Sequence, residues 1–276
     1  IEFLVIALGL GFGFGATAWL TAKFDLRRPN FRNVRIPAVA GLAFVLAAEW
    51  VYAYEWLAER LRLVPLDVTT PAAFFLVTLG FGTLGLLDDL KGDRSIGGFR
   101  GHFAALRQGR LTTGALKALG GGLFSLIAGY LICAPNMWLT LLAGALIALS
   151  ANALNLLDLR PGRCLFGFFL GAAVIIATLL SHHIGGYGFY LYVAVGIALI
   201  LYPLDASGRV MLGDTGSNAF GAVLGLSAAL YFSPLWQVVT VVVLLLFQWW
   251  CERRSLSKTI DSNPILRSLD RKIGVR

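Results

Sequence analysis

Long apolar stretches alternate with short polar ones along the whole chain. Nine of the apolar stretches are about 17–23 residues long, the length that a helix needs to cross a bilayer. They cover approximately 1–22, 36–58, 71–87, 113–132, 138–157, 165–182, 188–204, 217–232 and 235–251. This pattern predicts an all-α, polytopic helical membrane protein with about nine transmembrane helices, in a single integral-membrane domain over 1–276.

The polar connections differ in charge, and the difference alternates along the chain. Most of the 23 Lys and Arg residues lie in every second connection, namely 23–35, 88–112, 158–164, 205–216 and the segment after Cys251. The other connections contain only Arg60 and Arg62. Because basic loops stay in the cytoplasm, we expect the N-terminus outside and the C-terminus cytoplasmic. The first segment lacks a basic leader, so we expect a span rather than a cleaved signal.

Composition supports the membrane prediction and argues against a nucleic-acid-binding protein and against a cysteine metal site. Hydrophobic residues make up 58% of the 276 positions, charged residues 14%, and the mean hydropathy is +0.76. The net charge of +8 follows the loop alternation, so it indicates orientation in the membrane and not nucleic-acid binding. The cysteines Cys133, Cys164 and Cys251 lack metal-ligand spacing, and we expect them to be small packing residues.

Two adjacent carboxylates, Asp88 and Asp89, end the third apolar segment. A series of cations follows them: Lys91, Arg94, Arg100, Arg107, Arg110 and Lys117. Adjacent carboxylates repel each other, and a divalent metal that also holds phosphate oxygens would relieve the repulsion. The alternative is structural, since an Asp at a helix end also serves as a cap or as the partner of a nearby Arg.

Two later turns on the same predicted side carry related polar groups. Asn152, Asn155 and Asp158 recur at i, i+3 and i+6, which lines one face of a helix end with oxygens. A buried Asn can instead simply bond a neighbouring helix. The sequence Gly-Asp-Thr-Gly-Ser-Asn over 213–218 opens a helix with free N–H groups, hydroxyls and a carboxylate, which suits phosphate or metal-bound phosphate. We expect the three turns to form one site.

Together these motifs resemble a known family. The segments PNFRNVRIPAVAG, GLLDDLKGD, NALNLLD and MLGDTGSNAFG are similar to the ordered motifs of the polyprenyl-phosphate N-acetylhexosamine-1-phosphate transferases. That family includes phospho-N-acetylmuramoyl-pentapeptide transferase and the UDP-GlcNAc:undecaprenyl-phosphate transferases. The resemblance covers most of the chain and implies a transferase-like membrane domain in the plasma membrane, acting in cell-envelope glycan biosynthesis.

The resemblance also implies a reaction and a set of site residues. A sugar-1-phosphate would pass from a UDP-sugar to a polyprenyl phosphate, with Mg²⁺ as cofactor and UMP as product. Asp88, Asp89 and Asp214 would be the catalytic and metal-binding residues, Asp88 or Asp89 acting on the lipid phosphate. The substrate-binding residues would be Lys117, Asn152, Asn155, Asp158, Gly213 and Ser217. Dimerisation is a further expectation of the family.

The chain departs from the family pattern at two places. Pro161 stands where the second Asp of the Asn/Asp motif is usual, and the late segment lacks the histidine cluster that many members carry. The histidines present are His102, His182 and His183. These losses motivate an alternative: a non-catalytic relative that binds lipid-linked phosphate as a scaffold, sensor or carrier. An ion-coupled transporter has little support, because the span interiors offer few charges besides Glu49 and Glu55.

Overall fold

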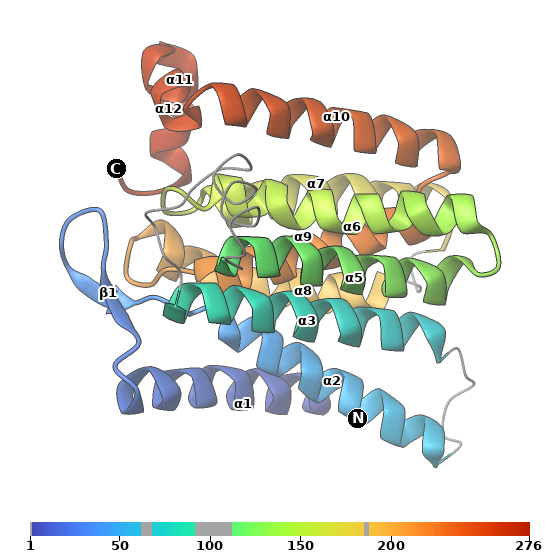
Figure 1. Cartoon of the computed structure of the whole chain (residues 1–276). Coiled ribbons are helices and arrows are strands. Elements are labelled where there is room, and N and C mark those ends of the chain that lie inside the picture. The colour runs from blue at the N-terminus through green and yellow to red at the C-terminus, as the bar shows by residue number, and fades with distance from the viewer. Residues whose placement is uncertain (1, 62–67, 92–111, 185–187) are drawn as a thin grey trace.

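A computed structural model describes residues 2–61, 68–91, 112–184 and 188–276. In these residues the elements are α1 (Glu2–Lys23), β1 (Arg27–Pro29), β2 (Arg35–Pro37), α2 (Leu42–Arg60), α3 (Thr69–Lys91), α5 (Thr113–Cys133), α6 (Met137–Leu157), α7 (Arg163–Ser181), α8 (Phe189–Ala206), α9 (Gly213–Tyr231), α10 (Pro234–Arg253), α11 (Leu256–Ser262) and α12 (Pro264–Ile273). The helices from α1 to α10 run side by side, and α11 and α12 lie at one end of the bundle (Figure 1).

Seven of the described helices are long and apolar enough to cross a membrane: α1, α3, α5, α6, α7, α8 and α10. This confirms the prediction of a multi-pass helical membrane protein. The apolar segments predicted at 36–58 and 217–232 also form helices, α2 and α9, but these are more polar. Glu49, Glu55 and Glu59 lie in α2, and α9 opens with the polar run at 213–218. The count of nine spans and the orientation stay predictions.

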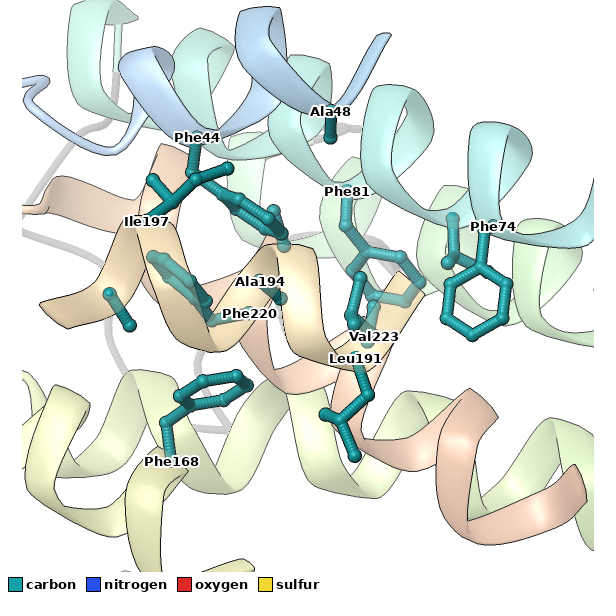
Figure 2. Close-up of a cluster of buried hydrophobic side chains, with 14 of the residues drawn as sticks. Phe44, Ala48, Phe74, Phe81, Phe168, Leu191, Ala194, Ile197, Phe220 and Val223 are labelled. Carbon is teal, nitrogen blue, oxygen red and sulfur yellow. The ribbon is translucent and has the colours of Figure 1, made fainter. Parts of the chain in front are cut away.

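Helix α9 lies at the centre of the bundle, packed mainly against α3 and α6. Its side chains from Thr215 to Gly221 are all buried. Phe220 stacks on Phe44 of α2, with 4.0 Å between ring centroids, and lies 4.9 Å from Phe168 of α7. Figure 2 shows these three rings meeting in the cluster that joins α2, α7, α8 and α9. A central helix surrounded by protein on all sides tolerates polar residues that a lipid-facing helix would not.

Small residues let α9 approach its neighbours closely, as is common in membrane helix packing. A Cβ atom added at Gly221 would lie 2.5 Å from the Cα of Ala151 in α6, and one at Gly225 would lie 2.5 Å from the Leu146 carbonyl oxygen. These contacts are with backbone atoms, which cannot move aside as a flexible side chain can. The glycines therefore set the distance between α6 and α9.

We expect Gly221→Ala to lower the stability by about 1–3 kcal/mol, because the added methyl group forces α6 and α9 apart. The thermal unfolding midpoint in detergent measures this change. Gly122→Ala is the matched control, since a Cβ at Gly122 meets nothing within 4 Å. The control should leave the midpoint unchanged or raise it, as Ala favours helix by about 1 kcal/mol over Gly. Equal midpoints for the two variants would contradict the packing argument.

The helix of the apolar segment predicted at approximately 36–58 begins later than expected, after a short hairpin. Residues Arg27–Pro29 and Arg35–Pro37 form an antiparallel hairpin, and α2 begins only at Leu42. The Asn30 side chain accepts hydrogen bonds from the backbone N–H groups of Arg32 and Val34, which closes the hairpin loop. Pro37 ends the second strand, where it pairs with Arg27, and it favours extended backbone at the preceding Ile36.

The segment after the hairpin, a bend and a turn over 38–41, is held beside the turn that precedes α9. The Met211 N–H donates to the Pro37 carbonyl at 2.8 Å, and the Ala40 N–H donates to the Met211 carbonyl at 3.0 Å. The Gly41 N–H donates to the Leu212 carbonyl at 3.0 Å. The Pro/Gly-containing stretch therefore pairs with the chain just ahead of α9 and fixes where α9 begins.

Candidate functional site

The acidic end of α3 and the polar start of α9 meet at one end of the bundle. The Asp214 N–H donates to the Asp89 Oδ1 atom at 2.9 Å, and the Thr215 N–H donates to Oδ2 at 2.9 Å. The Thr215 hydroxyl also donates to Oδ2, at 2.7 Å. The expected convergence of these two turns, which are 125 residues apart in sequence, is therefore present.

These contacts make Asp89 the cap of α9. The residue at the N-cap position of α9, Leu212, has no side-chain oxygen to offer the first N–H groups of the helix. Asp89 supplies that oxygen from α3 and accepts from two of those groups and from the Thr215 hydroxyl. A carboxylate at a helix N-terminus is also favoured by the helix dipole. The structural alternative considered for the aspartate pair therefore applies to Asp89.

Two glycines make this close approach of α3 and α9 possible. Gly213 has a φ of +70°, and a Cβ there would lie 2.6 Å from the Asp89 Oδ2 atom and 2.5 Å from the Ala38 carbonyl oxygen. A Cβ at Gly85 would lie 2.2 Å from the Asp214 carbonyl oxygen. Gly213, expected to bind substrate, is thus required at its position for backbone conformation and for space.

Asp88 belongs to a second set of contacts, centred on Asp214. Its carboxylate interacts with the hydroxyl of Thr113, at the start of α5, and with the Asp214 side chain. Lys117, one turn further along α5, forms an ion pair with Asp214. We call Asp88, Thr113, Lys117 and Asp214 the phosphate-site cluster, after the ligand that the sequence motifs lead us to expect at these turns. It joins the ends of three helices, α3, α5 and α9, and combines two carboxylates with one ammonium group.

The second predicted motif reaches this cluster through Asn155 and Asp158. The Asn155 side chain lies beside the Asp214 carboxylate and interacts with it, although its buried Nδ2 atom makes no hydrogen bond of normal geometry within the described residues. Asp158 is the C-cap of α6, where its N–H donates to the carbonyls of Leu154 and Asn155. Burial raises the pKa of the Asp158 carboxyl well above its usual value, and the charges of Asp205, Asp214 and Asp89 raise it further.

Asn152 and Ser217 do not join the cluster. The Asn152 amide donates to the Gln248 Oε1 atom of α10 at 2.7 Å, and the Gln248 amide donates to the Leu149 carbonyl at 3.1 Å. This is the helix-to-helix bonding considered for a buried Asn. Ser217 is fully buried, and its hydroxyl donates at 3.0 Å to the Gly213 carbonyl one turn earlier in α9. Both side chains serve helix packing in this structure.

A buried ion cluster beside Asp158 was not expected from the sequence. Arg163, at the start of α7, donates to both carboxylate oxygens of Asp270 in α12, at 2.6 and 2.8 Å. Arg276 also pairs with Asp270 and donates to the Pro161 carbonyl at 2.9 Å. We call Arg163, Asp270 and Arg276 the C-terminal ion cluster. Its members are up to 113 positions apart, so no local spacing could have indicated it.

The arginines of the C-terminal ion cluster lower the pKa of the Asp270 carboxyl. The Asp205 carboxylate lies next to this cluster. Burial alone would raise the pKa of the Asp270 carboxyl, but the hydrogen bonds and charges of Arg163 and Arg276 hold it well below its usual range. The buried Asp205 carboxylate accepts from the Gly162 N–H at 2.8 Å. Asp205 had no expected role, and here it fixes the turn that follows Asp158.

The described residues contain no group of three or more His, Cys, Asp or Glu side chains arranged to hold a metal ion. Of the three expected metal ligands, Asp89 accepts hydrogen bonds from the N-terminus of α9, whereas Asp88 lies beside Asp214. Mg²⁺ is usually held by one or two carboxylates plus water and phosphate oxygens. Asp88 and Asp214 provide the two carboxylates that such a Mg²⁺ site needs. Neighbouring carboxylates repel each other unless a cation or a shared proton relieves the repulsion, so this pair suits a bound cation.

Several residues singled out in the sequence cannot be placed. Arg94, Arg100, His102, Arg107 and Arg110 lie outside the described residues. Of the cations that follow the aspartate pair, Lys91 is exposed at the end of α3 and Lys117 belongs to the phosphate-site cluster. Comparison of the chain with protein-family models and with curated proteins gives no match.

Proposed function

We propose that this protein is an enzyme that transfers a sugar-1-phosphate from a UDP-sugar to a polyprenyl phosphate, releasing UMP, and that it is a divergent relative of the polyprenyl-phosphate N-acetylhexosamine-1-phosphate transferases. The reaction would take place at the cytoplasmic face of the plasma membrane, in cell-envelope glycan biosynthesis. One observation carries the proposal: Asp88, Lys117 and Asp214, from three helices, meet at one end of a membrane-spanning bundle.

The cluster suits the chemistry of this transfer. An oxygen of the lipid phosphate attacks the β-phosphorus of the UDP-sugar, a new P–O–P linkage forms, and the bond between the α- and β-phosphates breaks to release UMP. Asp88 accepts a proton from the lipid phosphate or positions it, and Lys117 binds the phosphate oxygens. Mg²⁺, held by Asp88 and Asp214, would neutralise the charge on the phosphates when bound. Asn155 places an amide donor beside Asp214.

The outer face of α5 suits a prenyl chain. Leu116, Leu119 and Leu123 are 40%, 62% and 57% exposed, and Leu116 immediately precedes Lys117. These residues follow one another along the same helix from the phosphate-site cluster toward the middle of the apolar segment. A lipid phosphate bound at Lys117 would therefore have an apolar surface for its tail, so the tail remains in the bilayer while the head group meets a soluble nucleotide.

The proposal is tested with purified protein, undecaprenyl phosphate, Mg²⁺ and either UDP-GlcNAc or UDP-MurNAc-pentapeptide. We expect UMP release that requires the lipid phosphate and stops when EDTA removes the metal. Asp261→Asn, which alters an exposed carboxylate of α11, is the control variant and should keep full activity. Absence of UMP release with every UDP-sugar, beside an active control enzyme, would count against catalysis.

A second candidate function is binding of polyprenyl-linked phosphate without turnover, as a scaffold, sensor or carrier. One observation favours it: Asp89, one of the expected catalytic and metal-binding carboxylates, caps α9. This candidate predicts that the protein retains undecaprenyl phosphate on purification and releases no UMP. It also predicts that Asp214→Asn leaves cellular function largely intact, whereas a transferase would lose it.

A further inference from the structure

Helices α11 and α12 lie directly after the last membrane-crossing helix. Helix α10 ends at Arg253, and α11 begins at Leu256. In Figure 1, α12 runs crosswise to α10, at the end of the bundle that also carries the β-hairpin. A helix crosswise to the spans, joined to one of them through the short helix α11, lies roughly parallel to the membrane plane. Its position is thus that of a surface helix at the lipid headgroups.

Helix α12 is strongly amphipathic. Ile265, Leu266 and Leu269 follow the i, i+1, i+4 spacing of one helix face, and they are 71%, 42% and 52% exposed. Arg267 and Arg271 lie on the other side of the helix, and Lys272 continues the row of Ile265 and Leu269 at the C-terminal end of the helix; all three cations are exposed. Within the described residues this apolar face has no protein neighbour to cover it. An apolar face beside cations, on a helix in the membrane plane, is typical of helices that insert into the headgroup region.

The rotation of α12 about its axis is fixed by buried and capping contacts. Asp270 is 5% exposed and binds Arg163 through both carboxylate oxygens. At the other end of the helix, the Asn263 Oδ1 atom accepts from the N–H groups of Ile265 and Leu266. Because Asp270 must face Arg163, the face of Ile265 and Leu269 cannot turn inward to pack on the bundle. The ion pair between Asp270 and Arg163 therefore keeps the apolar face of α12 turned outward.

We propose that α12 is a membrane-surface helix whose apolar face inserts among the lipids and whose cations bind anionic phospholipid headgroups. The surrounding charge is complementary to such lipids, since Arg253, Arg254 and Lys258 lie between the end of α10 and α12. Arg253 also stacks over the Trp249 ring, 4.4 Å from its centroid, at the height where aromatic residues anchor helices to the interface. The lipid-binding role of α12 does not require that the protein is a transferase.

The test uses the full chain in proteoliposomes, with spin labels placed one at a time at Ile265→Cys, Leu269→Cys and Ser268→Cys. The background carries Cys133→Ala, Cys164→Ala and Cys251→Ala and must keep the parent unfolding midpoint. In vesicles with phosphatidylglycerol, labels at 265 and 269 should be accessible to oxygen and shielded from a water-soluble nickel complex. The label at 268 should show the opposite accessibility. Equal nickel accessibility at all three positions would overturn the proposal.

Two further measurements distinguish anionic lipid from a second protein copy as the group that covers the apolar face of α12. The double variant Arg267→Glu/Arg271→Glu should raise the phosphatidylglycerol fraction needed for shielding by about twofold or more, because cations near the surface strengthen binding to anionic lipid. Arg209→Glu, which changes an exposed cation of the turn between α8 and α9, should leave that fraction unchanged. Shielding from both oxygen and nickel, with spin–spin coupling between protein copies, would instead mean that a second copy covers this face, and the lipid proposal would fail.

Discussion

Asp214→Asn should reduce the rate of UMP release by about 10²–10³-fold, the usual effect of removing one key electrostatic group from an active site. Asp214 is the residue on which the phosphate-site cluster converges: Lys117 pairs with it, and Asp88 and Asn155 interact with it. The substitution removes its charge and keeps its size and part of its hydrogen bonding. The initial rate at saturating lipid phosphate and UDP-sugar measures the loss.

The fold must be shown to survive this change, since Lys117 loses its ion-pair partner. The unfolding midpoint of Asp214→Asn is compared with that of Lys117→Met and of the double variant. Residues that act together on one phosphoryl group are not additive, so the double variant should be little slower than the slower single variant. Retention of activity within about fivefold of the parent in a folded Asp214→Asn protein would contradict a catalytic Asp214.

The helices were largely predictable because the membrane imposes a simple length rule on apolar segments. Each predicted segment coincides with a helix, including α2 and α9, whose polar residues make them poorer candidates for crossing. The prediction failed at 36–41, where hydropathy alone does not distinguish an apolar strand end and turn from a helix. The controlling contacts there are backbone pairs with residues 211 and 212, which are about 170 positions away in sequence.

The site was predictable at the level of helix ends but not of individual roles. The alternating charge of the loops placed the turns of Asp88, Asp158 and Asp214 on one side, and the structure brings them together. Which side chain faces which neighbour depends on helix rotation, and sequence spacing does not fix rotation between helices. Hence Asp88 and Asp89, adjacent in sequence, divide into a cluster residue and a cap, and Asn152 bonds α10.

The C-terminal ion cluster leads to the second large prediction. Arg163→Ala should destabilise the protein by about 3–5 kcal/mol, because it leaves the buried Asp270 carboxylate with only Arg276 as partner. Arg163 and Asp270 side chains are 4% and 6% exposed, so solvent offers little compensation. The unfolding midpoint in detergent measures the loss. Arg209→Ala, which removes an exposed cation at the same end of the bundle, is the control and should change the midpoint little.

The pH dependence of this interaction has a defined sign. The pKa of Asp270 is held below its usual value in the folded protein, so its contribution to stability is complete above the unfolded pKa of about 4. That contribution is lost as the pH falls through the folded pKa. The difference in midpoint between the parent and Asp270→Asn should thus be constant from about pH 5 to pH 8 and shrink below about pH 4. A difference that instead grows on acidification would show that Asp270 is not ionised in the folded state, and the docking of α12 through this ion pair would have to be abandoned.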